Sequence, residues 1–241
     1  MKKKILFVIF IFFTLVLTNI LIIASIERIL ISEDFHGIPQ RIYREDELLL
    51  ISDSLNTEIG VNKVFIEEFR LQSLIALSFY PELRNVEIHF KYSNEATTMA
   101  CRPDLLSLIK GRRIYYILIN NRKNFEGILL VDVPFNAQIG VIGHEIAHIL
   151  DYEGRNILGI IKVGLDYLHN DSKSQFEQYV DKMTIFRGLG WQLYDWAQYS
   201  MYDSPKATEE YKMFKRDIYL QPQQIITTMD IYSCYQILCN K

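Results

Sequence analysis

The chain has 241 residues, which is enough for one domain of roughly 200 residues with an appendage. Apolar residues make up 49% of the sequence, so a sizeable hydrophobic core can form. The net charge is -3 and no long basic run follows the first few positions, which argues against a nucleic-acid-binding protein.

The N-terminus combines a basic start with a long apolar run. Lysines at positions 2–4 precede uncharged residues 5–25, long enough to cross a bilayer as a helix. Because the lysines would stay in the cytoplasm, we expect residues 1–26 to be a transmembrane anchor. Residues 27–241 would then form an extracytoplasmic domain, periplasmic or extracellular. The alternative is a cleaved signal peptide and a secreted protein, but residues 23–25 match a cleavage site poorly.

The region before residue 134 predicts a helix followed by strands. Residues 58–79 carry apolar side chains at helical spacing and stop before Pro81. Apolar and β-branched runs predict three strands, at residues 86–90, 113–120 and 127–133. Residues 96–103 are typical of a polar connection, and a short helix is expected through residues 105–109.

Residues 141–150 contain the pattern His-Glu-x-x-His within an apolar frame, and Asn136 is placed to cap the helix that would carry it. His144 and His148 are four positions apart, so both imidazoles lie on one helix face and can bind one ion. Glu145 points sideways from that pair, where it can reach a metal-bound water. Two such histidines with an adjacent Glu are typical of zinc sites in which the Glu is the general base.

The frame around this motif is similar to that of zinc metallopeptidases. Val141 stands three positions before the first His, and Leu150 follows the second His by two; the variable sites between are uncharged. A buried helix explains the frame, because a charge on its back face would be unpaired. The chain thus resembles the gluzincin type of zincin. That resemblance implies an α+β fold, in which a small N-terminal sheet and the active-site helix precede an all-helical C-terminal part.

In the gluzincins the third zinc ligand is usually a Glu on a later helix. Glu177 lies 29 positions after His148, and Asp181 follows one turn later. This segment resembles the Glu-x-x-x-Asp segment of the prenyl-protein-protease-like and heat-shock-protease-like peptidases, although Val180 stands where Ala is common. The resemblance implies that Glu177 is the third ligand of one Zn²⁺ ion. Asp181 would accept the free ring N–H of a ligating His. A solvated acidic helix face is the alternative.

Asp151 is a rival for the third position, because His-Glu-x-x-His-x-x-Asp resembles other zincin subfamilies and the Mlc titration factor peptidases. On one rigid helix, however, Asp151 would lie about 10 Å along the axis from His144. Bonds to zinc are about 2 Å long, so we expect Asp151 to support the ligands or the helix end instead. If Glu177 is not the ligand, Glu153 and Asp166 are the next candidates.

Residues 157–168 are apolar but too short for a membrane span, and we interpret them as a core or membrane-surface helix. The last fifty residues predict packed helices, with a break at residues 203–205 and a new start at residues 219–222. We interpret the three cysteines as ordinary thiols, although a short C-terminal bridge is possible; they are Cys101, Cys234 and Cys239. Four residues could stabilise a transition state, and the sequence does not choose among them: Tyr179, Arg187, His169 and Tyr194.

Together these patterns predict a membrane-anchored zinc metallopeptidase acting on a peptide or protein substrate. Zinc would activate a water and Glu145 would take its proton. Two alternatives stay open: a catalytically silent, zinc-stabilised extracytoplasmic binding module, and a metal-free helical protein with an accidental motif. The intact Glu145 argues against the first alternative, and the complete apolar frame argues against the second.

Overall fold

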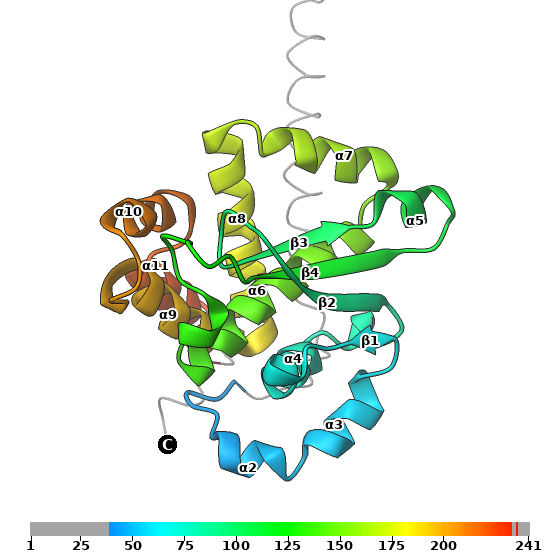
Figure 1. Ribbon diagram of the computed structural model, residues 1–241, viewed down its shortest axis with the longest axis horizontal. Helices are drawn as coiled ribbons and strands as arrows, with labels where there is room; N and C mark the ends of the chain where they lie inside the picture. The colour runs from blue at the N-terminus through cyan, green and yellow to red at the C-terminus, as the bar shows by residue number, and fades with distance from the viewer. Residues whose placement is uncertain (1–38, 233–234, 236–241) are drawn as a thin grey trace, which may run out of the picture. The chain divides into compact units, whose positions relative to one another are not determined.

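A computed structural model describes residues 39–232 and residue 235, which form a mixed fold of one small sheet and many helices (Figure 1). The strands are β1 (Lys63–Val64), β2 (Glu87–Ser93), β3 (Met99–Pro103) and β4 (Ile114–Asn120). The helices are α2 (Glu45–Leu49), α3 (Ser52–Ile59), α4 (Arg70–Ser78), α5 (Leu105–Ile109), α6 (Phe135–Glu153), α7 (Ile157–Asp166), α8 (Asn170–Thr184), α9 (Gly190–Gln198), α10 (Glu209–Ile218) and α11 (Pro222–Asp230). A sheet that precedes a run of helices confirms the predicted α+β class.

The sheet has the strand order β1-β2-β4-β3. β1, β2 and β4 are parallel, whereas β3 pairs antiparallel with β4 and forms one edge of the sheet. β4 is the central apolar strand, and its residues Tyr115, Ile117 and Ile119 are almost fully buried. Among the described residues, β3 and the two-residue β1 are therefore the two edge strands of the sheet, and β3 is the longer of them.

Helix α6 runs through the middle of the fold. It packs against β3 and β4 on one side, and against α4, α8 and α9 elsewhere, and Figure 1 shows the sheet and helices α8–α11 on opposite sides of it. Its apolar residues Ile139, Ile142 and Ile146 are fully buried. The backbones of α6 and α9 meet at Gly140, where a Cβ atom would lie 2.1 Å from the carbonyl oxygen of Gln192. The site helix is thus fixed by packing on several sides.

The predicted helix at residues 58–79 is wrong in its first half. The chain leaves α3 at Gly60, turns through Asn62, and enters β1 before α4 begins at Arg70. Asn62 has a φ of 60°, in the left-handed region that Asn tolerates better than most residues. Its side-chain amide also donates to the carbonyl of Asn85. The turn therefore interrupts an apolar spacing that resembles one continuous helix.

Two assignments near the sheet edge also need correction. Residues 127–133 were predicted as a strand, but they form an irregular segment with a single 3₁₀ turn, Leu130–Asp132. Its carbonyls are satisfied by side chains, since Thr98 donates to Ile128 and Gln138 donates to Leu130. Conversely, β3 lies in the predicted polar connection. Its extended shape comes from pairing with β4, which a local pattern does not reveal.

Asn136 does not cap α6. The helix begins at Phe135, and Pro134 at the N-cap position makes no side-chain hydrogen bond to the first turn. The Asn136 side chain instead accepts from the backbone N–H of Tyr43 and donates to the Tyr43 carbonyl, at 2.8 and 3.0 Å. It therefore holds the segment before α2 against the site helix.

The predicted membrane span also needs correction. Among the described residues, no helix is both long and apolar enough to cross a bilayer. α6 has 19 residues but carries the polar motif, and α7 is apolar but has only 10. This finding contradicts the predicted transmembrane helix and the predicted single-pass, extracytoplasmic localisation. Residues 1–26, on which that prediction rested, lie outside the described residues, as do Cys234 and Cys239.

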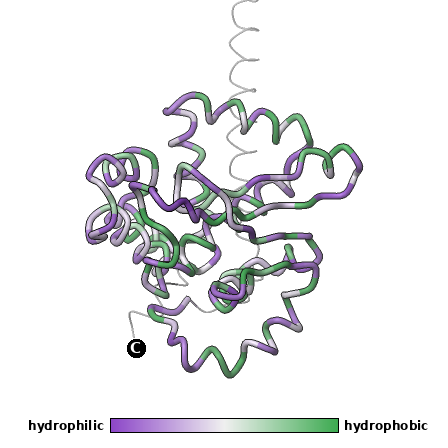
Figure 2. The backbone as a smooth tube through the Cα atoms, viewed as in Figure 1, coloured by the Kyte–Doolittle hydropathy of each residue, from purple (hydrophilic) through white to green (hydrophobic). Residues whose placement is uncertain are grey.

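Helix α7 lies at the surface. Ile160 and Val163 are buried, whereas Leu158 and Leu165 are 75% and 58% exposed. Figure 2 shows that α7 is coloured as hydrophobic along much of its length, so apolar side chains lie on both its buried and its exposed faces. The helix therefore lies on the outside of the fold rather than in its core.

Candidate metal centre

Three buried side chains from two helices converge at one point. His144 and His148 project from α6, and Glu177 projects from α8; all three are less than 5% exposed. One ligand atom from each lies within 4.8 Å of the others. The Oε2 atom of Glu177 is 3.0 Å from Nε2 of His144 and 3.4 Å from Nε2 of His148. This group could hold a metal ion.

The donor atoms have the spacing and chemistry that such an ion needs. Tetrahedral bonds of about 2.0–2.1 Å to zinc place ligand atoms about 3.3 Å apart, close to the 3.0 and 3.4 Å that separate Oε2 of Glu177 from the two imidazole nitrogens. If Nδ1 of His144 carries the ring proton, its Nε2 and the Glu177 carboxylate present lone pairs to each other. That contact is repulsive unless a proton or a cation lies between them. The residues present therefore fit a bound divalent metal.

Asp181 fixes the orientation of His144. Its Oδ1 lies 2.8 Å from Nδ1 of His144, and its Oδ2 accepts from the backbone N–H of Leu220 at 2.8 Å. Asp181 is 2% exposed, so this carboxylate is held by α8, α6 and the end of α10 together. The contact is the one expected for the partner of a metal-binding imidazole. By contrast, Nδ1 of His148 is buried and has no hydrogen-bond partner in the described part of the chain.

Tyr167 contacts the candidate third ligand. This residue follows α7, and its hydroxyl donates to Oε1 of Glu177 at 2.6 Å. Burial, followed by the nearby Glu177 charge, raises the pKa of Tyr167 far above its ordinary value, so the hydroxyl keeps its proton. The two oxygens of Glu177 thus have different tasks, with Oε2 facing the histidines and Oε1 held by Tyr167.

The charged residues of this group shift one another's pKa values. Burial acts to lower the pKa of His144, but Asp181 and Glu177 outweigh it and raise that pKa to about 10. Burial acts to raise the pKa of Glu177, but the two imidazoles hold it well below its usual range. Without a metal, a shared proton therefore keeps the group together near neutral pH.

Glu145 lies beside the triad rather than in it. It is 6% exposed, and among residues 39–232 no group donates a hydrogen bond to its carboxylate. Burial raises the pKa of Glu145, an effect that the imidazoles of His148 and His144 partly oppose. A buried carboxylate with a raised pKa, next to a group that could hold a metal ion, is chemically suited to accept a proton.

The remaining acidic candidates have other partners. Asp151 pairs with Arg155 at 2.5 and 2.9 Å and stabilises the end of α6. Glu153 accepts from the hydroxyl of Tyr115 at 2.6 Å. Asp166 lines a surface cavity described below. None of the three belongs to the converging group.

The four candidates for a transition-state stabiliser are held elsewhere. Arg187 pairs with Glu82 at 2.7 Å, and Tyr194 lies under the guanidinium of Arg41. Tyr179 stacks on Phe176, and His169 is an exposed residue before α8.

Three residues that the sequence did not single out surround the triad instead: Tyr167, Lys215 and Tyr219. The Tyr219 ring is 5.6 Å from that of His144, and the Lys215 ammonium lies 3.7 Å from the centre of the Tyr219 ring. No local pattern marks them, because tertiary packing of α7 and α10 brings them to the site.

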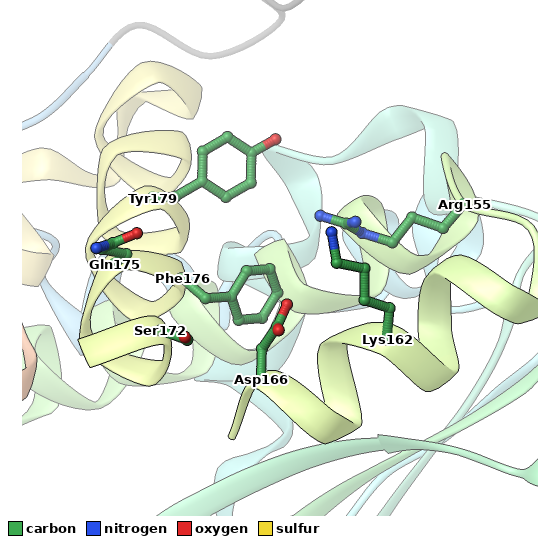
Figure 3. Close-up of a pocket in the computed structure, with 7 residues that line it drawn as sticks. All are labelled: Arg155, Lys162, Asp166, Ser172, Gln175, Phe176 and Tyr179. Carbon is green, nitrogen blue, oxygen red and sulfur yellow. The ribbon is translucent and has the colours of Figure 1, made fainter. Parts of the chain in front are cut away.

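An open cavity of about 430 Å³ lies next to the triad. Figure 3 shows Arg155 and Lys162 reaching toward α8, from which Phe176 and Tyr179 project. The three candidate ligands do not line this cavity. The Phe176 ring, which does, packs against His148 with ring centres 5.4 Å apart. The cavity therefore lies on the outer side of Phe176.

No model of a protein family, no curated protein and no solved structure matches the chain.

Proposed function

We propose that this chain is a zinc-dependent peptidase with a zincin-like fold of the gluzincin type. The observation that supports the proposal most is the buried convergence of His144, His148 and Glu177, with Asp181 oriented on His144. Two of these residues belong to the motif, and the other two come from a helix that follows it. If the motif were accidental, we would not expect Glu177 at Nε2 of His144 and Asp181 at Nδ1 of the same ring.

The chain supplies the groups needed to move protons during peptide hydrolysis. A zinc ion held by the triad would lower the pKa of a water to about 7 and polarise the scissile carbonyl. Glu145 accepts the proton of the attacking water and transfers it to the leaving amine. Asp181 keeps the His144 ring in one orientation, and Tyr167 keeps the Glu177 carboxylate in place.

The sheet edge offers a way to bind an extended peptide. β3 is an edge strand and packs against α6. Cys101 in β3 lies near the site: burial raises the pKa of its thiol, and the charges of Glu145 and Glu177 raise it further. A peptide that pairs with this edge would form backbone hydrogen bonds beside the motif.

Replacing the general base tests this proposal. Glu145→Gln is expected to bind zinc like the wild type, yet to lower turnover by about 10²-fold or more, because proton transfer is lost. Hydrolysis of a mixed peptide library is followed by mass spectrometry, and zinc is measured by elemental analysis. Glu153→Gln on the same helix is the matched control and should keep full activity. Wild-type cleavage by Glu145→Gln would refute the assigned role.

A further inference from the structure

Lys215 is a buried residue whose ammonium has no oxygen partner in the described part of the chain. It lies in the last turn of α10 and is 4% exposed. Within the described residues, its ammonium makes no hydrogen bond and no ion pair; its neighbours are the faces of Tyr219 and Trp196, at 3.7 and 5.1 Å. Cation–π contacts replace part of the lost hydration, but burying an ammonium without an oxygen partner is costly. Such a side chain suggests a ligand that is bound during function.

The position of Lys215 relates it to the candidate metal centre. The Tyr219 ring under its ammonium lies edge-on to the ring of His144. Burial lowers the pKa of Lys215 to about 8, and the charges of Glu177, Asp181 and Glu145 oppose this shift. The side chain is therefore still protonated at neutral pH and lies within the electrostatic reach of the site.

Among the described residues, none of the three nearby carboxylates, those of Glu177, Asp181 and Glu145, forms an ion pair with Lys215. Glu177 is already held by the histidines and by Tyr167. Asp181 is held by His144 and by the backbone of Leu220. Lys215 thus keeps a positive charge beside a site at which peptide hydrolysis would create or present negative oxygen.

We propose that Lys215 contacts the substrate at the candidate metal centre, where its ammonium binds an anionic oxygen. That oxygen belongs either to a C-terminal carboxylate or to the oxyanion that develops on the scissile carbonyl. A preformed cation on a largely buried side chain stabilises either charge with little reorganisation. The inference rests on the proposed function, because that function places the substrate at the triad.

Two probes separate the two sources of the oxygen. N-acetylglycine carries a terminal carboxylate and is compared with its neutral amide. A phosphinate dipeptide with blocked ends carries only the charge that imitates the oxyanion. Binding of each probe to the full, zinc-loaded chain is measured at equilibrium by calorimetry. Lys215→Met should lower the affinity for one of the two anionic probes by about 10-fold or more, because a charge-assisted hydrogen bond is lost.

Matched variants separate this role from a structural one. Lys215→Arg keeps the charge and should retain most of the binding. Lys212 lies three residues earlier on the same helix and pairs with Glu209 at 3.3 Å. The variant Lys212→Met should bind both probes as the wild type does. If Lys215→Met binds only N-acetylglycine more weakly, the anionic oxygen belongs to a C-terminal carboxylate. If it binds only the phosphinate more weakly, the oxygen is the oxyanion. Wild-type affinity of Lys215→Met for both probes would overturn the inference.

A measurement on the wild type covers the case in which Lys215→Met fails to fold. In the chain labelled with ¹³C at lysine Cε, the Lys215 resonance, assigned by its absence in Lys215→Arg, should shift when the bound probe is added. No shift with either probe would overturn the inference. All these readouts are independent of turnover. If Glu145→Gln refutes hydrolysis while Lys215 still discriminates between the probes, the proposed function fails and the anion contact stands.

Discussion

The contact between Asp181 and His144 predicts a specific loss of metal affinity. Asp181 accepts two N–H groups, one from His144 and one from Leu220, both at 2.8 Å. Asn in its place has one oxygen and one NH₂ group, so it can accept from only one of them and turns a donor toward the other. Asp181→Asn should therefore weaken zinc binding by about 10–100-fold, as removal of such partners usually does. That corresponds to about 1.4–2.7 kcal/mol.

A competition titration against a chromophoric chelator measures this loss. Asp151→Asn is the matched control, because Asp151 pairs with Arg155 and forms no hydrogen bond with either histidine. Its zinc affinity should stay within about 2-fold of the wild type. Unchanged affinity in Asp181→Asn, or a larger loss in Asp151→Asn, would refute the reasoning about which carboxylate orients the ligand.

Two further predictions concern stability. Because the pKa of His144 is raised to about 10 in the metal-free protein, its contribution to stability is complete below the unfolded value of about 6.5 and is lost as the pH rises toward 10. Urea unfolding of the chelator-treated protein should thus show a lower midpoint at about pH 9 than at about pH 6. In His144→Ala this decline should be smaller. A midpoint that rises between these pH values would contradict the raised pKa of His144. Gly140→Ala should destabilise the fold by at least about 1–3 kcal/mol, because its Cβ would meet the Gln192 carbonyl at 2.1 Å. In Gly164→Ala, on α7, the new Cβ would meet no described atom within 4 Å, so this variant should be neutral or stabilising by up to about 1 kcal/mol. Equal changes in unfolding free energy for the two variants would argue against the packing of α6 on α9.

The part of the site that the sequence predicts is the part set by local helix geometry. His144 and His148 share a face because they are four positions apart, and Asp181 follows Glu177 by the same interval. Each pair shares one helix face as soon as its own helix, α6 or α8, is formed. Their meeting at one point depends on helix packing, which the family resemblance implied and no local pattern encodes.

What the sequence did not predict depends on distant contacts. Lys215 and Tyr219 reach the site through the packing of α10 against α8, and Tyr167 reaches it from the end of α7. Asn136 looks like a helix cap, but its amide meets the backbone of Tyr43, 93 positions away. β3 is extended because β4 lies beside it. In each case the deciding partner is remote in sequence.

The most direct test of the metal centre is the zinc content of the purified full chain, measured by elemental analysis in the wild type, in Glu177→Ala and in Glu153→Ala. Glu177 belongs to the converging group, whereas Glu153 binds Tyr115 and lies outside it. The geometry predicts about one zinc per chain in the wild type and in Glu153→Ala, and a sharp loss in Glu177→Ala. Zinc retained in Glu177→Ala, or no zinc in the wild type after incubation with the metal, would contradict the proposed centre.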